Sequence, residues 1–444
     1  MNDAFADIQK AIFKLPETSL FKRQIFKWTT QFEKVCYLDS NDYPQELGDS
    51  YDCLVGVGME SELLIDQERG ADPFLQLQNY YETKKDWLFG FLTYDLKNDI
   101  ENLVSENNDG LGFPKLHFFE PSYVLKIKNG FVEIESKKEI PSVIFQIISA
   151  IKLSKKEKPI FEKTPNLQSR ISKDDYLKTI RSIHEHLHKG DIYEMNFCQE
   201  FYAKNCELNV SELFQKLNRI SKAPFSAYYR LAEHHLLSSS PERFLKKEGN
   251  KLISQPIKGT TKRGKTIEED RTLKKALSES QKDKSENVMI VDLVRNDLAK
   301  SCKAGSVKVE ELFKIYPFEQ VFQMISTISG QLKSDTHFIE AIKNAFPMGS
   351  MTGAPKVRSM QLIEHYEQSM RGLYSGAIGY ITPKGDFDFN VVIRSILYNA
   401  DRKYLSYQVG GAIVYDSIPE NEYEECLLKA KGMLQAMGIK ENKN

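Results

Sequence analysis

The chain has 444 residues, of which 41% are hydrophobic and 28% are charged, a composition typical of a globular protein with a substantial core. Its 61 Lys and Arg residues are balanced by 62 Asp and Glu residues, so the formal net charge of -1 provides no long-range field for nucleic acid or an anionic membrane surface. The length allows two or three domains, or one large mixed fold.

The cysteines and the N-terminus predict a cytoplasmic location. Six cysteines are scattered without a Cys-x-x-Cys motif, which favours reduced thiols over a disulfide framework. The N-terminal sequence "MNDAFADIQKAIFKLPE" carries acids and no continuous apolar segment, and no run of about 18 apolar residues occurs in the chain. We therefore expect neither a secretion signal nor a membrane-spanning helix.

Residues 1–165 are predicted to be rich in short strands. Candidate strands are "CLVGVG" and "WLFGFLTYDL", and "SYVLKIKNGFVEIES" predicts a hairpin because Asn129-Gly130 separates two alternating apolar runs. The charged, proline-containing stretch "KLSKKEKPIFEKTPN" (152–166) is the predicted linker to the next region.

Residues 170–440 are predicted to contain both helices and strands. Apolar spacing predicts a helix that begins after Ser172 and ends at Gly190. Further helices are predicted in "SENVMIVDLVRNDLAK", "TGAPKVRSMQLIEHYEQS" and "PENEYEECLLKAKGMLQAM", and strands in "DIYEMNFCQEFYA", "YSGAIGYITP", "DFNVVIRSILYNA" and "KYLSYQVGGAIVYDS". The chain therefore reads as a mixed α/β (α+β) protein in which most strands are joined by hairpins.

Three short motifs have a functional and a structural interpretation. The run His184-Glu185-His186-Leu187-His188 matches the His-Glu-x-x-His zinc pattern, but its helix is predicted to end at Gly190, so the alternative is a helix C-terminus where histidines face the negative end of the dipole. "VGVGMES" lacks the third glycine of a dinucleotide fingerprint, and "GSMTGAPK" lacks the end of a phosphate-binding loop. Both are predicted to be turns.

A lysine and a glutamate form the strongest candidate for chemistry. Lys258 lies in "SQPIKGTTKRG", where a strand runs into a turn, and Glu242 lies sixteen residues earlier in "SSSPERFL". Brought together by a hairpin, the two could serve as nucleophile and general acid, provided that burial or a nearby cation lowers the pKa of the amine. The alternative for Ser-Pro-Glu is the first turn of a helix.

Two pairs of carboxylates are candidates for a magnesium site. Asp283 and Glu286 are spaced i, i+3 on one predicted helix, and Glu422 and Glu425 on another, so each pair shares a helical face. Hard oxygen ligands of this kind suit Mg²⁺, which takes one or two carboxylates and completes its shell with water and substrate. The alternative is a pair of solvated acidic first turns.

The last strands contain candidate anion-binding groups. Arg394 lies in the apolar run "FNVVIRSIL", where a guanidinium matches a carboxylate bidentately, although an internal ion pair is the alternative. Gly410, Gly411 and Ala412 can present backbone N–H groups to a second acid.

Taken in order, these motifs carry a family resemblance. The segments "SSSPERF", "PIKGT", "ENVMIVDLVRNDL", "STISG", "MTGAPKVRSMQLIE", "YSGAIGYI", "VVIRSI", "VGGAIVYDS" and "EYEECLLKA" resemble the chorismate-binding enzymes, most strongly over residues 172–437. The resemblance implies a single large fold with two packed β-sheets surrounded by helices, Mg²⁺ as cofactor and chorismate as substrate.

Within this family the lysine is informative. Anthranilate synthases typically carry alanine at the position of Lys258, whereas the lysine form is similar to aminodeoxychorismate synthases. The resemblance implies that the Lys258 amine attacks ring carbon 2 of chorismate, that Glu242 protonates the departing oxygen, and that ammonia then enters at carbon 4 and expels the lysine.

The resemblance also assigns ligands. Glu286 and Glu425 are implied as direct metal ligands, with Asp283 and Glu422 farther from the metal. The implied substrate contacts are Arg394, Tyr380, Gly411 and Ala412 for the enolpyruvyl carboxylate, with Thr260 and Lys429 as further contacts.

Several positions depart from the family pattern. Glu194 occupies the place of the lysine base of the isochorismate and salicylate synthases, so activation of water by that route is not expected. Gln323 replaces a usual His, Ala412 a usual Gly and Cys426 a usual Thr. The stretch 224–226 resembles a segment that holds tryptophan in some members, without a convincing N-terminal counterpart.

The expected source of ammonia is a second protein. No cysteine has the context of a glutaminase nucleophile, so a separate glutamine amidotransferase subunit is implied. With no fused lyase expected, the predicted product is 4-amino-4-deoxychorismate, a precursor of 4-aminobenzoate and folate. The alternatives are an anthranilate synthase large subunit and a catalytically silent chorismate-binding protein.

Overall fold

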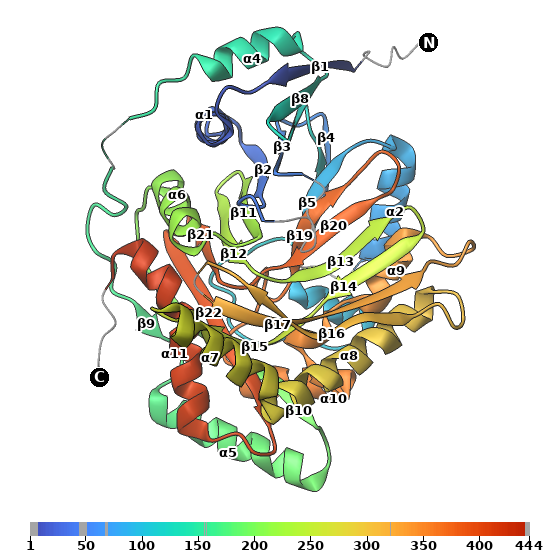
Figure 1. Ribbon diagram of the computed structural model, residues 1–444, viewed down its shortest axis with the longest axis vertical. Helices are drawn as coiled ribbons and strands as arrows, with labels where there is room; N and C mark the ends of the chain where they lie inside the picture. The colour runs from blue at the N-terminus through green and yellow to red at the C-terminus, as the bar shows by residue number, and fades with distance from the viewer. Residues whose placement is uncertain are drawn as a thin grey trace.

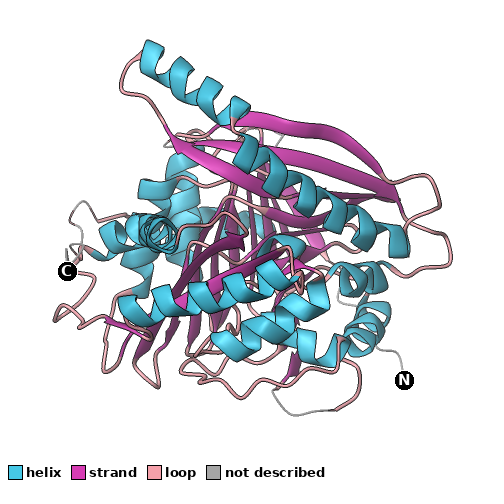
Figure 2. Ribbon diagram, turned by 90° about the horizontal axis from the view of Figure 1, so that it is seen from below, coloured by secondary structure: helices cyan, strands magenta, loops and turns pink. Residues whose placement is uncertain are grey.

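The computed structural model describes residues 8–43, 51–66, 70–154, 156, 158–319 and 321–439. Part of the N-terminal sequence used above to argue against a secretion signal, residues 1–7, lies outside the described residues. The described strands form two antiparallel sheets of twelve and ten strands, with helices around them (Figure 1, Figure 2). The mixed α/β fold with two sheets is therefore confirmed.

The larger sheet has the strand order β1-β8-β7-β3-β2-β11-β12-β21-β22-β10-β18, and β9 pairs with β10. Its strands are β1 (Gln9–Lys14), β2 (Lys34–Asp39), β3 (Cys53–Val57), β7 (Tyr123–Lys128), β8 (Phe131–Ser136), β9 (Gln168–Ser169), β10 (Glu194–Ala203), β11 (Phe225–Leu231), β12 (His234–Ser240), β18 (Gly353–Ala354), β21 (Ser395–Asn399) and β22 (Tyr404–Val414).

The smaller sheet has the order β15-β17-β14-β13-β20-β19-β5-β6-β4, and β16 pairs with β17. Its strands are β4 (Ser61–Ile65), β5 (Leu88–Leu92), β6 (Leu116–Glu120), β13 (Arg243–Glu248), β14 (Lys251–Gln255), β15 (Ile257–Lys262), β16 (Lys308–Pro317), β17 (Val321–Gln331), β19 (Ala377–Ile381) and β20 (Phe387–Val391).

The helices flank these sheets. They are α1 (Thr18–Thr29), α2 (Pro73–Lys84), α3 (Lys97–Ile100), α4 (Pro141–Ser149), α5 (Lys173–Lys189), α6 (Val210–Ser221), α7 (Ile267–Glu279), α8 (Gln281–Ser301), α9 (Phe338–Ala345), α10 (Lys356–Tyr366) and α11 (Pro419–Met437), with short 3-10 turns η1 (Tyr94–Leu96) and η2 (Gly349–Met351). The expected signals of α5 are confirmed: the Ser172 side chain accepts from the Asp175 N–H, and Gly190 ends the helix at φ 76°.

The core follows the alternation of side chains along the strands. On β3, Leu54 belongs to the apolar cluster shared by both sheets, whereas its neighbour Val55 belongs to the cluster beneath α1, α4, α6 and α11. The shared cluster includes Phe389 of the smaller sheet and Leu236 of the larger one. The two sheets therefore pack face to face, with helices over the outer face of the larger sheet.

Two predicted elements differ from the structure because the chain crosses between sheets. The predicted strand "DFNVVIRSILYNA" is split into β20, in the smaller sheet, and β21, in the larger sheet. The helix considered at Ser-Pro-Glu is absent as well: Pro241 and Glu242 connect β12, in the larger sheet, to β13, in the smaller one. Both sequences have strand-like patterns on each side of the crossing. The pattern therefore does not show that the chain passes from one sheet to the other.

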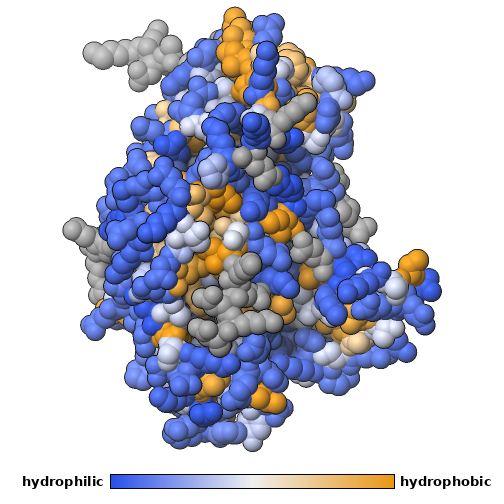
Figure 3. Space-filling model, turned by 90° about the vertical axis from the view of Figure 1, so that its left-hand side faces the viewer, coloured by the Kyte–Doolittle hydropathy of each residue, from blue (hydrophilic) through white to orange (hydrophobic). Residues whose placement is uncertain are grey.

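The visible surface is mostly polar. Figure 3 shows a face covered mainly by hydrophilic residues, with apolar residues in scattered groups. Among the described helices, none is both long and apolar enough to cross a membrane.

Candidate functional site

The two crossings between the sheets lie side by side and position two candidate residues. The Val391 N–H donates to the Glu242 carbonyl at 3.0 Å, and the Ser239 N–H donates to the Arg394 carbonyl at 3.2 Å. Arg394 has φ 52°, in the left-handed region that a non-glycine residue adopts only at a cost. The crossings thus place Glu242 and Arg394 at the seam between the sheets.

Glu242 is a buried carboxyl group with its protonated form favoured. Its Oε1 accepts a hydrogen bond from the Ser350 hydroxyl at 2.5 Å. Burial raises the pKa of Glu242 to about 7, although this hydrogen bond and the charge of Lys258 oppose the shift. Ser350, in the "MGSMTGAPK" segment, was not identified from the sequence.

Lys258 lies at an irregular point of β15. The ladder with β17 shifts register between Ile257 and Thr260, and Gly259 has φ 86°, which a side chain disfavours. The Lys258 Nζ is 2.6 Å from Glu194 Oε1. A buried lysine and a buried glutamate of different sheets therefore form one ion pair.

The protonation state of Lys258 differs from the expectation. Burial alone lowers its pKa, but the charges of Glu194, Glu286 and Glu242 and the hydrogen bond to Glu194 raise the pKa above its ordinary value. The condition set for a nucleophilic amine, a lowered pKa, is therefore not met by these surroundings. Burial acts in the expected direction, but the charges of the three carboxylates outweigh it.

The carboxylates of α8 and α11 converge, as their predicted helical spacing requires. Glu286 Oε1 and Glu422 Oε1 lie 3.9 and 3.5 Å from the Lys282 Nζ, so one cation stands between the two helices. Asp283 lies beside Lys258, because a Cβ added to Gly259 would be 3.0 Å from its carboxylate. Burial is the main reason that the pKa of Glu286 rises to about 7. Lys282 was not identified from the sequence.

The end of β22 meets α11. A Cβ added to Gly411 would lie 3.5 Å from Glu422 Oε2, 3.6 Å from Lys429 Nζ and 3.8 Å from Glu425 Oε1. Lys429 donates to the Gly410 carbonyl at 2.8 Å and pairs with Glu425 at 2.8 Å, and its charge lowers the pKa of Glu425. β22 pairs with β21 only up to Ser406, so Gly411 and Ala412 have a ladder on the β10 side alone among the described strands.

Arg394 has an unmatched positive charge. No hydrogen bond or ion pair joins its guanidinium to another side chain in the part of the chain that the structure describes. Burial lowers the pKa of Arg394, while the neighbouring Tyr374 and Glu425 oppose this. The guanidinium is therefore available to an incoming anion.

The two tyrosines of "RGLYSGAIGY" have different surroundings. Tyr380 packs in an aromatic group, with ring centroids 5.9 Å from Trp87 and 6.2 Å from Tyr51. Tyr374 is the tyrosine near Arg394, and its hydroxyl lies 3.5 Å from Cys198 Sγ. The sequence analysis named Tyr380 as a substrate contact and did not name Tyr374, although both belong to the same motif; the role of Tyr380 stays a prediction.

Thr260 and Gln323 are paired across β15 and β17. Thr260 is exposed, two residues from Lys258, whereas Gln323 is buried and its Oε1 has no hydrogen-bond partner in the described part of the chain. Cys426 is buried on α11 and accepts from Gln199 at 3.4 Å.

The stretch 224–226 does have N-terminal neighbours in the structure. Asn41 Nδ2 donates to Ser226 Oγ at 3.0 Å and to the Ala223 carbonyl at 2.7 Å. The adjacent Asp39 pairs with Lys22 at 3.0 Å. The polar groups of Ser226 and Ala223 are thus contacted by Asn41, a residue of the N-terminal region.

Two of the three histidines of α5 lie next to each other, and the third has other partners. His186 contacts Asp191 at 2.7 Å and Tyr366 at 3.1 Å, while the rings of His184 and His188 have centroids 6.1 Å apart. Within the described ranges, no group of three or more His, Cys, Asp or Glu residues is arranged to hold a metal ion. His184 and His188 thus have no third ligand of this kind beside them among the described residues, and the magnesium carboxylates are not arranged as a ready-made cage either.

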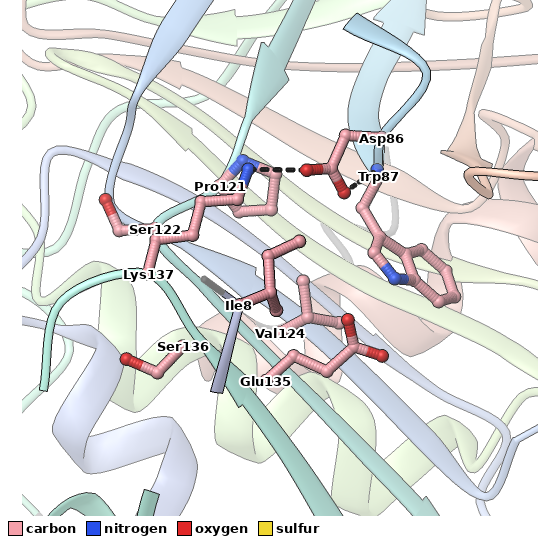
Figure 4. Close-up of a pocket in the computed structure, with 9 residues that line it drawn as sticks. All are labelled: Ile8, Asp86, Trp87, Pro121, Ser122, Val124, Glu135, Ser136 and Lys137. Carbon is pink, nitrogen blue, oxygen red and sulfur yellow. Dashed lines mark hydrogen bonds and ion pairs between the residues drawn. The ribbon is translucent and has the colours of Figure 1, made fainter. Parts of the chain in front are cut away.

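A separate hollow lies away from these residues. It has an empty volume of about 200 Å³, open in part to solvent, and contains none of the predicted site residues. Figure 4 shows Lys137 pointing to Asp86 across it, and the two form an ion pair of 2.7 Å. The third charged residue of its lining, Glu135, pairs with Lys10 at 3.1 Å, so each of these charges has a partner, unlike that of Arg394.

Comparison with known proteins gives the class of the protein. Residues 33–435 match the chorismate binding enzyme family. The chain therefore belongs to the chorismate binding enzyme family.

Relatives within the family carry two different names. The chain is 40% identical over 277 residues to aminodeoxychorismate synthase component 1 of Escherichia coli strain K12, covering 62% of this chain and 60% of that protein. It is 34% identical over 354 residues to an anthranilate synthase component I-like protein of Synechocystis, covering 79% and 72%. An aminodeoxychorismate synthase of Streptomyces griseus is 40% identical over 282 residues, covering 63% of this chain but 38% of that protein. The chain thus spans less than two thirds of both relatives named aminodeoxychorismate synthase.

Solved structures share the fold. Anthranilate synthase component I from Streptococcus pneumoniae superposes with a TM-score of 0.74 at 24% identity, covering 86% of this chain and 91% of that one.

Proposed function

We propose that the protein is an aminodeoxychorismate synthase component I, which converts chorismate and ammonia to 4-amino-4-deoxychorismate. The observation that carries the proposal is Lys258, buried beside the carboxyl group of Glu242 where an anthranilate synthase typically has alanine. The E. coli and S. griseus relatives with this activity in their names support it.

The chain's own residues provide the binding and the proton. Arg394 holds a carboxylate of chorismate, because no side chain of the described residues pairs with its guanidinium, and Tyr374 lies near it. The further substrate contacts of the proposal are Thr260, Tyr380, Gly411, Ala412 and Lys429. Lys258 attacks ring carbon 2, and the carboxyl proton of Glu242 passes to the departing hydroxyl at carbon 4. A pKa of about 7 suits Glu242 to this role near neutral pH.

The donor set fits Mg²⁺. Glu286 and Glu422 already face one cation, Lys282, and Mg²⁺ takes one or two carboxylates together with water and substrate oxygens. We assign Glu286 and Glu425 as direct ligands, with Asp283 and Glu422 farther out. When bound, the ion would act as a Lewis acid that makes the ring a better electron acceptor.

The ammonia is proposed to come from a separate glutamine amidotransferase subunit. The word component in the names of relatives supports a partner. The purified chain should use ammonium salts but not glutamine, and should gain glutamine dependence when the amidotransferase is added.

A product assay tests the proposal. Purified protein is supplied with chorismate, Mg²⁺ and ammonium salt, and the products are separated by chromatography and identified by mass. We expect 4-amino-4-deoxychorismate and a lysine-linked adduct at Lys258. Anthranilate as the main product would instead support the second candidate, anthranilate synthase, which the Synechocystis relative favours. No turnover at any ammonia concentration would support a silent binding protein.

A further inference from the structure

Glu194 is held rigidly at the seam between the sheets. It is the first residue of β10, where its neighbours are Ala354 of β18 and Val414 of β22. The Ser359 hydroxyl donates to the Glu194 carbonyl at 3.1 Å, and a Cβ on Gly353 would be 2.1 Å from that oxygen. The backbone on both sides of the carboxylate is therefore fixed.

Only one of the two carboxylate oxygens of Glu194 accepts a hydrogen bond from the described residues. Its Oε1 accepts from Lys258 Nζ at 2.6 Å, whereas its buried Oε2 has no hydrogen-bond partner among the residues that the structure describes. Glu194 is 1% exposed, so solvent does not compensate that oxygen. A buried acceptor without a partner is destabilising, and such a group calls for an explanation such as a chemical role.

The proposed function leaves one proton unassigned. A lysine attacks only as the free amine, and Lys258 is held as an ammonium ion by its surroundings. Glu242 does not serve as the acceptor, because its role requires that it carries a proton itself. The carboxylate in contact with the ammonium belongs to Glu194.

We propose that Glu194 is the general base that takes the proton of Lys258 when chorismate is bound and returns it after the lysine is expelled. The inference rests on the proposed function. Transfer over 2.6 Å converts a buried ion pair into a neutral amine and a neutral acid, so no isolated charge is left in the low-dielectric interior.

The protons and bonds balance over the cycle. The Lys258 ammonium gives a proton to Glu194, and the amine then bonds to carbon 2 while the hydroxyl at carbon 4 leaves as water with the Glu242 proton. Ammonia bonds to carbon 4 and the bond between carbon 2 and nitrogen breaks, which releases a neutral lysine. Glu194 returns its proton to that lysine, and the new ammonium group at carbon 4 reprotonates Glu242.

Other charges face Lys258 without contacting it. Glu286 lies on α8 and Glu242 lies between β12 and β13, and both act on Lys258 through their charge. No ion pair joins Lys258 to either of them among the described residues. Asp283 approaches Gly259, next to Lys258. Glu194 is therefore the acceptor that geometry selects.

Two measurements on the full-length protein test the proposal. In the first, trace acetic anhydride labels Lys258 without substrate, and mass spectrometry follows the labelling between pH 5.5 and 9. In the wild type Lys258 should label slowly at pH 7, and in Glu194→Gln about tenfold faster, since losing the paired charge lowers the pKa of the lysine and increases its free amine fraction.

In the second, the Lys258 adduct is quenched and quantified after mixing with chorismate and Mg²⁺ without ammonia, between pH 5.5 and 7. Wild-type adduct should form at a pH where labelling shows the amine to be protonated. In Glu194→Gln the adduct rate should instead follow the free amine fraction and rise about tenfold per pH unit below its midpoint. Glu194→Asp, which keeps the base, should restore the wild-type profile in part.

Glu200→Gln is the matched control. Glu200 lies on the same strand and is equally buried, but it pairs with Arg170 at 2.7 Å. Its loss should leave labelling and adduct formation unchanged, whatever it does to stability. Two results would overturn the assignment of Glu194 as the general base and leave the proposed function intact. One is a wild-type adduct rate that follows the free amine fraction, and the other is unchanged labelling of Lys258 in Glu194→Gln. A wild-type protein that forms no adduct at all overturns both.

Discussion

At the scale of single residues, the site holds two buried titratable groups in opposite protonation states. Burial favours the neutral form of Glu242, whereas three carboxylates favour the charged form of Lys258. In the proposed mechanism Glu242 can therefore donate a proton at neutral pH, whereas Lys258 must first lose one. The opposite states arise from their neighbours, since both side chains are buried.

Removing the lysine should change the product. Lys258→Ala leaves Glu242, the carboxylates and Arg394 in place but has no nucleophile for carbon 2. We expect the rate of 4-amino product to fall by at least about 1,000-fold, with slow 2-amino or 2-hydroxy products from direct attack of ammonia or water. Products are identified by chromatography and mass. Lys262→Ala, at the exposed end of β15, is the control and should keep the wild-type product. Near-normal 4-amino product from Lys258→Ala would exclude covalent catalysis.

Glu242 should couple stability to pH. Its folded-state pKa of about 7 is above the ordinary 4.5, so the stability that it contributes is complete below pH 4.5 and is lost as pH rises through 7. At about 1.4 kcal/mol per pH unit, the free energy of unfolding of the wild type should fall by up to roughly 3 kcal/mol between pH 4.5 and 8 because of Glu242. The glutamine of Glu242→Gln does not ionise, so the variant should lack this contribution.

Urea unfolding at pH 5 and pH 8 measures this effect. The difference in unfolding free energy, variant minus wild type, should be larger at pH 8 than at pH 5. The turnover of the variant should fall about 100-fold, because it lacks the proton donor. Parallel stability profiles for the two proteins would show that Glu242 is ionised in both the folded and the unfolded chain.

At the scale of elements, sequence predicted which segments form strands and helices better than where the chain changes sheet. The hairpin at Asn129-Gly130, helix α5 with its caps and the proline that opens α11 are all local signals, and all are confirmed. The crossing at Arg394 depends on ladders with β12 and β13, which are distant in sequence.

In the candidate site too, the sequence predicts local arrangements but not contacts between residues that are distant in sequence. Asp283 and Glu286 share a face of α8 as their spacing predicts, but the partner of Lys258 lies 64 residues away and no local pattern indicates it. The motif that contains Tyr374 and Tyr380 does not show which ring is near Arg394, because that depends on how β19 packs against β5.

The cation between α8 and α11 should compete with Mg²⁺. Lys282 contacts carboxylates of both helices, so an entering metal ion must displace its ammonium group. Its side chain is 56% exposed, which limits the strength of the contact to about 1 kcal/mol or less. We expect Lys282→Met to tighten Mg²⁺ binding about 3- to 5-fold, measured by calorimetry on the substrate-free protein.

The control for this effect is Lys284→Met on the same helix. Lys284 makes no ion pair with Glu286 or Glu422 in the described structure, so its loss should leave the Mg²⁺ affinity within error of wild type. Weaker Mg²⁺ binding in Lys282→Met would contradict the competition and indicate that Lys282 orients the ligands.

At the scale of the whole molecule, residues 1–165 and 170–440 share both sheets. β2 pairs with β11 in the larger sheet, and β5 pairs with β19 in the smaller one. The apolar cluster between the sheets likewise combines Phe91 and Phe118 from the first region with Leu236 and Phe389 from the second. We propose that the two regions are one folding unit, despite the linker-like composition between them.

Separating the regions should therefore unfold both. A chain of residues 170–440 keeps every predicted site residue, but it exposes the free edges of β11 and β19 and the apolar residues that faced the first region. Unpaired edges and uncovered core favour aggregation over a stable fold. We expect this fragment alone to show no cooperative thermal transition by circular dichroism, and co-expression with residues 1–165 to restore one. A fragment that melts cooperatively by itself and binds chorismate would show that the first region is an added layer and that the boundary near residue 165 separates two folding units.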